Sequence, residues 1–390
     1  MAPLDANPDL SSPPQAVEVD NISPLPDVII HHIFCFLPFK DLVKTSVLSK
    51  QWRLAWTSTP NIDVSLRSWL VIPLISKALS LCTATKIEKF HVDFYVRTEF
   101  DLWFHFAAAR QVEDASLVFG GSNRVVPQFM CDCTSLVSLR ISKATFPPDF
   151  TIHWPSLKKL CLHDFIFDYF PSEKDVIMKI MRGCPVLESF TLRSSWLEAR
   201  DIWIDSRSLR ELVIEADISS SLILSAPNLL SLCLSAATCH ENHIRKLVSS
   251  GTELILFGLS SWVLSRTGIK GRPYLSSRWR NIVVYTTVCK SELKGIAFLL
   301  RSSPLLERLA ICNPKSNNAR FRKKDFPKLC NFVEKQFGCS RKDFPCVANQ
   351  LKRVEIVGFE FNNEKSKLLR ALSKFLLEET VELEKIDNPC

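Results

Sequence analysis

Residues 22–56 read ISPLPDVIIHHIFCFLPFKDLVKTSVLSKQWRLAW, and the prolines in this segment divide it into three predicted short helices. Pro24 and Pro26 stiffen the chain before the first helix, and Asp27 is a candidate cap for it. Pro38 ends the first helix because proline cannot continue the hydrogen-bond ladder. The two further segments are Asp41–Leu48 and Ser49–Trp56.

Apolar residues occupy two neighbouring sides of the first predicted helix. One side holds Ile29, Ile33, Phe36 and Leu37, and the next holds Ile30 and Phe34. A unit of this size cannot enclose so much apolar surface by itself. We therefore expect part of that surface to contact another protein. The alternative is that these helices pack against the rest of the chain.

The order of residues from Ile22 to Trp56 resembles an F-box, from the Leu25-Pro26 pair to the tryptophans at its end. The resemblance implies docking on the SKP-type adaptor of a cullin-RING ubiquitin ligase. It assigns adaptor contacts to Leu25, Pro26, Ile29, Ile33, Leu37, Pro38, Leu42, Val47, Trp52 and Trp56. For the two tryptophans, packing inside the domain is an equally good interpretation.

The composition is that of a soluble intracellular protein: 390 residues, of which 46% are hydrophobic and 23% charged. A net charge of +8 is too small to indicate nucleic-acid binding by itself. Residues 1–15 lack the apolar core of a secretory signal, and no apolar run is long enough to cross a bilayer. We expect a cytoplasmic or nuclear location, or both, no membrane partner, and reduced thiols for the 14 cysteines.

A short pattern recurs from Ile87 onward: an apolar residue, two others, an apolar residue, one other, and a third apolar residue. The last two apolar residues are predicted to point inward from a short strand. The matches are Ile87-Phe90-Val92, Val112-Ala115-Leu117, Leu136-Leu139-Ile141, Leu157-Leu160-Leu162, Leu187-Phe190-Leu192, Leu209-Leu212-Ile214, Leu229-Leu232-Leu234, Leu254-Phe257-Leu259, Leu306-Leu309-Ile311 and Leu351-Val354-Ile356. Stacked units of this kind form a curved parallel sheet.

Other features complete the repeat prediction. A poorer strand is expected near Trp279–Val288, and outer helices at Glu173–Arg182 and Ser291–Arg301. The region from Ile87 to Asn313 resembles the irregular leucine-rich repeats of plant F-box proteins. Regular repeats place Asn or Cys three residues beyond the pattern, whereas Ala144 and Phe165 stand there in this chain. An unrelated α/β array is the alternative.

Residues between the inward apolar positions are predicted to face out from the inner side of the sheet. As a candidate face for an unknown target protein they are His91, Asp93, Arg140, His163, Thr191, Arg193, Glu211, Glu215, Ser231 and Arg308. An ordinary solvated face is the other interpretation of each of them.

The carboxy-terminal part resembles the FBD module that follows leucine-rich repeats in plant F-box proteins. The resemblance rests on the sequence NQLKRVEIVGFEFNNEKSKLLRALSKFLLEETVELEKI. We expect the module to cover the open end of the repeats. The predicted divisions are a disordered tail at 1–20, the F-box at 21–66, leucine-rich repeats at 67–314, a basic linker at 315–325 and the FBD domain at 326–390.

No catalytic motif is present, since phosphate-binding glycine loops, His-Glu-x-x-His and Gly-x-Ser-x-Gly are all missing. Cys239, His240 and His243 have ligand-like spacing but do not complete a zinc site. We expect no enzyme activity, cofactor or metal.

The resulting hypothesis is an α/β F-box protein, with repeats and an FBD module, that recruits a target protein to a SKP-cullin-RING ubiquitin ligase. One alternative is an F-box scaffold that does not promote degradation. Another, which we expect less, is a nucleic-acid-binding repeat protein that uses the basic residues within 266–280 and 320–328.

Overall fold

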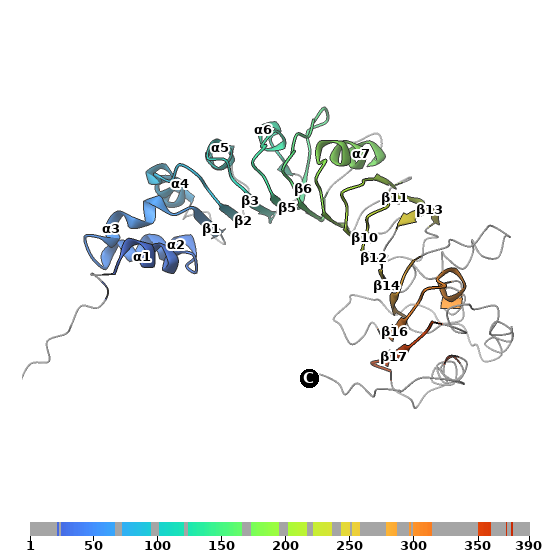
Figure 1. Ribbon diagram of the computed structural model, residues 1–390. Coiled ribbons are helices and arrows are strands. Elements are labelled where there is room, and N and C mark those ends of the chain that lie inside the picture. Colours follow the sequence, from blue (N-terminus) through green and yellow to red (C-terminus); the bar gives the residue numbers. More distant parts are fainter. Residues whose placement is uncertain are drawn as a thin grey trace, which may run out of the picture.

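The structure is a computed structural model, in which the chain forms an arch with helices on its outer side and strands along its inner side (Figure 1). It describes residues 22, 25–66, 72–94, 101–120, 124–165, 173–194, 202–216, 221–235, 243–249, 252–257, 278–286, 296–297, 299–313, 350–359, 372 and 376. The predicted α/β class, with a long parallel sheet and outer helices, is confirmed. Among these residues no helix has the length and apolarity of a membrane span.

The N-terminal helices follow the proline punctuation. They are α1 (Asp27–Phe34), α2 (Phe39–Lys44), the 3-10 turn η1 (Thr45–Val47), α3 (Trp52–Ala55) and the 3-10 turn η2 (Trp56–Ser58). Pro26 and Pro38 adopt extended backbone immediately before α1 and α2. Asp27 is therefore the first helical residue and not the cap that we predicted, although its negative charge still suits the first turn.

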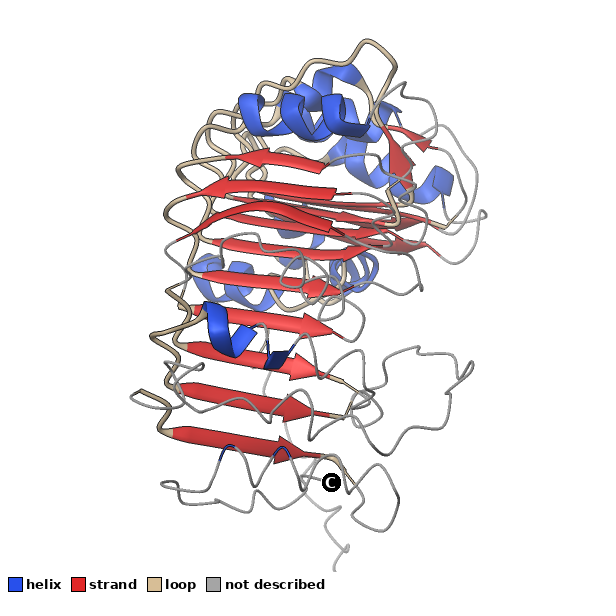
Figure 2. Cartoon of the chain, turned by 90° about the vertical axis from the view of Figure 1, so that its right-hand side faces the viewer, coloured by secondary structure: helices blue, strands red, loops and turns tan. Residues whose placement is uncertain are grey.

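Twelve parallel strands form one sheet in the order of the chain (Figure 2). They are β1 (Asn61–Leu66), β2 (Lys89–Phe94), β3 (Asp114–Phe119), β5 (Ser138–Ser142), β7 (Lys159–His163), β8 (Ser189–Ser194), β10 (Glu211–Ala216), β12 (Ser231–Ser235), β14 (Glu253–Phe257), β15 (Asn281–Tyr285), β16 (Arg308–Cys312) and β17 (Arg353–Val357). The pairing is in register, so equivalent residues of successive repeats stand side by side.

Nine of the ten repeat patterns place their last two apolar residues on a strand of this sheet, turned toward the core, as predicted. The exception is Leu254-Phe257-Leu259. Leu254 pairs with Leu232, so that Leu254 and Leu256 are the inward residues and our register was wrong. The poorer strand expected near Trp279 exists as β15.

The sheet begins earlier than the repeat pattern indicated. Strand β1 pairs with β2 and buries Ile62 and Val64, but Thr59 stands where the other repeats have their first apolar residue. The Thr59 side chain is nonetheless fully buried. The pattern missed this strand because it required an apolar residue at that place.

The outer side changes character along the arch. Helices α4 (Ile72–Leu81), α5 (Asp101–Ala109), α6 (Gln128–Cys131) and α7 (Glu173–Gly183) cover its first half, together with short strands β4 (Arg124–Val125) and β6 (Ala144–Thr145). A separate parallel sheet follows, made of β9 (Ile202–Asp205), β11 (Ser221–Ala226) and β13 (His243–Ser249). The helix predicted at 173–182 is confirmed. Of the one predicted at 291–301, residues 296–297 and 299–301 are helical, and the remainder lies outside the described residues.

The outer sheet was not predicted. The returns from β8 to β10 and from β10 to β12 are shorter than the return that holds α7. A strand advances about 3.3 Å per residue and a helix about 1.5 Å, so a short return crosses the repeat more easily as a strand.

Regular repeats have Asn or Cys beyond the strand, and this chain does not. At the ends of two strands, hydrogen bonds between backbone groups connect neighbouring repeats instead. Lys143 and Asp164 have positive φ angles of 56° and 48°. Their N–H groups donate to the carbonyl oxygens of His163 (2.9 Å) and Arg193 (2.6 Å) on the next strand. The residues that follow, Ala144 and Phe165, are buried and fill the outer turn with apolar groups.

The carboxy-terminal segment extends the same sheet, because β17 pairs with β16. Glu355 on β17 accepts two hydrogen bonds of 2.8 Å from Arg308 on β16, which fastens the last strand. Leu372 and Leu376 are buried. The tail at 1–20, the linker at 315–325 and the rest of the FBD segment lie outside the described residues.

Candidate functional site

Six large apolar side chains form the core of the N-terminal helices. They are Ile30, Phe34, Phe39, Leu42, Trp52 and Trp56. The rings of Phe34 and Trp52 meet edge to face at 5.6 Å, as do those of Phe39 and Trp56 at 6.2 Å. Leu42, one of the predicted adaptor contacts, is fully buried in this chain, and its contact with an adaptor stays a prediction. Of the two interpretations of the tryptophans, internal packing is the one that the structure has.

The Leu25-Pro26 segment is fastened to the far end of this domain. The Gln51 side-chain amide donates to the Leu25 carbonyl oxygen at 3.0 Å and to an Asp27 carboxylate oxygen at 2.8 Å. The Trp52 indole N–H donates to the Ile22 carbonyl oxygen at 3.2 Å. Trp52 thus holds the segment that begins at Ile22 against the helices. Its position gives it a structural function at this site.

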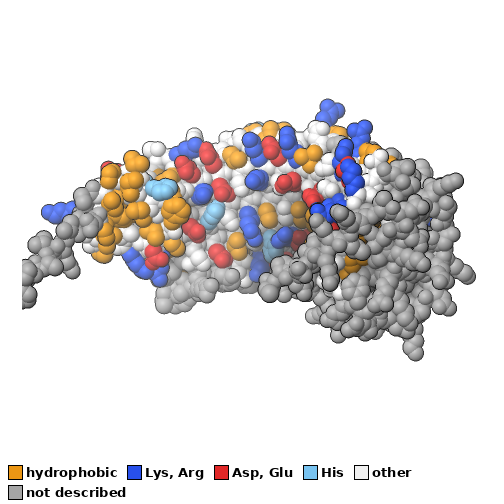
Figure 3. All heavy atoms as spheres, turned by 60° about the horizontal axis from the view of Figure 1, so that its bottom comes forward, with side chains coloured by type: hydrophobic (Ala, Val, Ile, Leu, Met, Phe, Trp, Pro, Cys, Tyr) orange, Lys and Arg blue, Asp and Glu red, His pale blue; other side chains and the backbone are white. Residues whose placement is uncertain are grey.

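A second set of apolar side chains on the same helices is exposed to solvent. The exposed fractions are 78% for Val28, 45% for Ile29, 75% for Phe36, 84% for Val47, 49% for Leu48 and 68% for Leu54. Figure 3 shows hydrophobic side chains gathered over the N-terminal end of the molecule, at the left of that view. So much exposed apolar area on one small domain is typical of a protein-interaction site.

The predicted adaptor contacts are distributed between this surface and the layer beneath it. Ile29 and Val47 are exposed, as are Pro26 and Pro38, whereas Leu25, Ile33 and Leu37 are half-buried against the core. Their contact with an adaptor stays a prediction.

Four exposed residues of this surface, Val28, Phe36, Leu48 and Leu54, were not among the predicted contacts. For Phe36 a signal was present, since it shares the helix side of Ile29 and Ile33.

The ten candidate target-face residues all lie on sheet strands, at the positions that alternate with the buried apolar residues. They point away from the outer helices, toward the concave side of the arch that Figure 3 turns to the reader. The structure therefore places His91, Asp93, Arg140, His163, Thr191, Arg193, Glu211, Glu215, Ser231 and Arg308 on one continuous surface. Binding of a target there remains a prediction.

Several charges on the concave side are paired with one another. His91 Nε2 lies 3.3 Å from an Asp114 carboxylate oxygen, and this contact lowers the pKa of the Asp114 carboxyl. A guanidinium nitrogen of Arg193 lies 3.1 Å from a carboxylate oxygen of Glu215. The hydrogen bonds from Arg308 likewise hold the pKa of Glu355 below its ordinary value. These pairs leave fewer charges available to a ligand than the sequence suggested.

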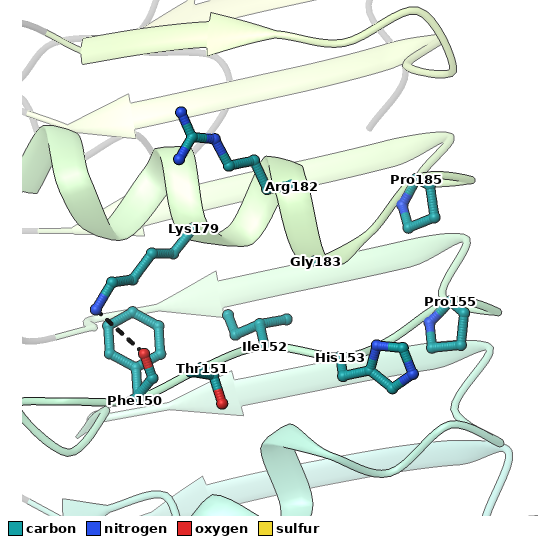
Figure 4. A pocket seen from close by; sticks show the side chains of 9 residues that line it. All are labelled: Phe150, Thr151, Ile152, His153, Pro155, Lys179, Arg182, Gly183 and Pro185. Carbon is teal, nitrogen blue, oxygen red and sulfur yellow. Dashed lines mark hydrogen bonds between the residues drawn. The ribbon is translucent and has the colours of Figure 1, made fainter.

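A cleft of about 380 Å³ lies on the outer side, between helix α7 and the segment 150–155 (Figure 4). Gly183 permits the close approach of these elements, since a side-chain carbon at that position would lie 2.5 Å from the Ile152 carbonyl oxygen. The Lys179 ammonium donates to the Phe150 carbonyl oxygen at 3.1 Å and lies 4.5 Å from the centre of the Phe150 ring. Of the two cations that line the cleft, Lys179 and Arg182, Lys179 is thus already engaged.

Several cysteine thiols of the described residues are buried. Burial raises the pKa values of Cys131 and Cys184 to about 12, so these thiols remain protonated. No group of three His, Cys, Asp or Glu side chains within the described ranges is placed to hold a metal ion. Cys239 and His240 lie outside those ranges.

Comparisons with known proteins match the N-terminal helices and the repeats. The family model of the F-box domain matches residues 22–62, and the one described as "FBD-associated F-box protein At5g56370, LRR repeats" matches residues 100–272.

Three relatives come from Arabidopsis thaliana. F-box/LRR-repeat protein 25 is 34% identical over 237 residues, which cover 57% of this chain and 88% of that protein. F-box protein At5g03100 is 35% identical over 256 residues (63% and 78%), and F-box/LRR-repeat protein At5g02910 is 26% identical over 413 residues (94% and 87%).

Proposed function

Because this chain belongs to the F-box/LRR-repeat family, we propose that it is the substrate-recognition subunit of a SKP-cullin-RING ubiquitin ligase. In this proposal the N-terminal helices dock on the SKP-type adaptor, and the concave sheet with the carboxy-terminal segment holds a target protein. A cytoplasmic or nuclear location, where such ligases act, is part of the proposal.

The observation that carries the proposal is that the N-terminal helices have two separate sets of apolar side chains. One set of apolar side chains closes the domain core, and a second set, led by Phe36 and Val47, stays exposed. Burying a large apolar side chain contributes about 1.5–3 kcal/mol. A few such residues provide enough free energy for a stable complex, after the losses of motion that association imposes.

The mechanism is positioning and requires no chemistry from this chain. A target held on the arch stays near the ubiquitin-charged enzyme that the rest of the assembly binds. Tethering of this kind raises the effective concentration of the target lysine. The matched F-box and repeat families supply interaction surfaces, in agreement with a non-catalytic subunit.

The test is co-purification of the tagged full-length chain with the SKP-type adaptor, the cullin and the RING subunit. In the Leu25→Ala/Pro26→Ala variant we expect at least a tenfold reduction of recovered adaptor, because the segment loses its contacts. The control variant Pro304→Ala/Leu305→Ala removes the same residue types from an exposed turn of the repeats, where Leu305 is 43% exposed. Undiminished recovery with the first variant would refute the docking assignment. Recovery of the complete ligase without any change in target half-lives on removal of the chain would favour the scaffold alternative.

A further inference from the structure

Because the strands pair in register, equivalent residues of successive strands form rows that run across the concave side of the sheet. The middle row joins one residue from each strand: Asp63, His91, Ser116, Arg140, Cys161, Thr191, Val213, Cys233, Ile255, Val283, Ala310 and Glu355. From β1 to β8 these residues are mostly polar or charged. From β10 to β16 they are apolar. The change of character occurs between two adjacent strands.

The centre of the polar half is basic. Arg140 on β5 and Lys159 on β7 are exposed, and neither has an ion-pair partner among the residues that the structure describes. His163 on β7 and Arg193 on β8 lie beside each other, and each already contacts a carboxylate. His163 lies 3.5 Å from Asp164, and Arg193 lies 3.1 Å from Glu215. Arg140 and Lys159 therefore supply the uncompensated positive charge.

The side chains around these cations are small. Ser138 stands opposite Lys159, and Cys161 stands opposite both Arg140 and Thr191. Long cationic side chains beside short ones leave space above the sheet that an anionic group can enter. The hydroxyl of Thr191 adds a hydrogen-bond donor.

The apolar half of the middle row, which we call the lane, has acidic residues in the rows beside it. Val213, Cys233, Ile255 and Val283 are partly exposed along the middle row. Glu211 and Glu253 lie in one row beside the lane, and Glu215, whose charge is paired with Arg193, lies in the row on the other side. Carboxylates there repel acidic groups, so a ligand with an acidic end and an apolar end can lie along the sheet in one orientation only. Figure 3 shows the mixture of acidic and basic side chains across the middle of this face.

We propose that the concave face binds an extended segment of the target protein in which acidic residues stand next to a run of apolar residues. The acidic part lies over β5–β8 beside Arg140 and Lys159, and the apolar part lies over the lane from β10 to β15. Adjacent strands are about 4.8 Å apart, so the distance from β7 to β15 is about 24 Å, or roughly seven extended residues. This inference deepens the proposed function and rests on it, since it names the class of target.

The experiment offers the purified full-length chain to a display library of random 12-residue peptides. We expect enriched peptides to contain Asp or Glu followed or preceded, within about seven residues, by aliphatic or aromatic residues. Synthetic copies of these peptides should bind the Arg140→Glu/Lys159→Glu variant at least tenfold more weakly than the native chain. The matched control is Lys77→Glu/Arg182→Glu, which makes the same charge change at exposed positions of α4 and α7 on the outer side.

Enrichment of basic peptides, no enrichment at all, or equal loss of binding in the two charge-reversed variants would overturn the proposal. If charge reversal unfolds the chain, as judged by its melting transition, Arg140→Gln/Lys159→Gln replaces it with the same expected direction. Adaptor binding is measured on the same preparations. The Leu25→Ala/Pro26→Ala variant should lose the adaptor and keep the peptides, which separates a failure of this inference from a failure of the proposed function.

Discussion

The Phe36→Ser/Val47→Ser variant is expected to bind the SKP-type adaptor at least 100-fold more weakly than the native chain. Both side chains are more than 70% exposed in the free protein and contribute little to the core, so their loss should leave the melting temperature nearly unchanged. In the complex each is expected to be buried, and two such residues contribute about 3–6 kcal/mol. A change of that size corresponds to a factor of at least about 100 in the dissociation constant, which titration calorimetry measures directly.

The control is Leu74→Ser/Leu102→Ser. These leucines are 66% and 78% exposed on α4 and α5, outside the N-terminal domain, so their replacement should leave adaptor affinity as it was. A matching loss of affinity in both variants would mean that nonspecific hydrophobic association, and not the surface formed by Phe36 and Val47, drives binding. Unchanged affinity in the first variant would remove Phe36 and Val47 from the interface.

The Trp154→Ala variant is expected to have the largest effect on stability, about 3–5 kcal/mol. The Trp154 side chain is fully buried beneath the outer loops, where it packs near Phe146. Its indole N–H donates to the Met130 carbonyl oxygen at 2.8 Å, at the end of α6. Alanine leaves a cavity and removes one of the two hydrogen bonds that this carbonyl accepts, the other coming from the Cys133 N–H at 3.3 Å. The measurement is the midpoint of urea unfolding, followed by circular dichroism.

Trp203→Ala provides the comparison for this experiment. Trp203 lies on β9 and is 40% exposed, so its replacement should cost about 1 kcal/mol or less. If the two tryptophan variants unfold at the same urea concentration, the packing described around Trp154 does not stabilise the solenoid.

The sequence predicted the concave side of the protein well for a physical reason. Parallel strands that are covered on one face tend to alternate between buried and exposed residues, and the spacing of Leu160 and Leu162 reports that alternation directly. In-register stacking then places every exposed residue between them on a single surface. His91, Arg140 and Arg308 could be assigned to one face without any coordinates.

Other features depended on information that a local pattern lacks. Thr59 begins a repeat with a polar residue whose burial only the fold reveals, so strand β1 escaped notice. Near Leu254 the pattern matched only the wrong register, because Gly251 stands where the correct register needs its first apolar residue, and the pairing of Leu254 with Leu232 reveals the true one. Leu42 and Val47 are both aliphatic residues of the F-box segment, yet one is fully buried and the other is 84% exposed. Tertiary packing, and not residue type, decides which of them a partner can reach.

The most direct test of the central claim is hydrogen–deuterium exchange of the full-length chain with and without the SKP-type adaptor. The claim is that the N-terminal helices carry an apolar surface that another polypeptide covers, while the repeats remain available to a target. It predicts slower exchange on adaptor binding in peptides from residues 25–54 and unchanged exchange in strands β5 to β10. Protection confined to those strands, or no protection in residues 25–54, would contradict it.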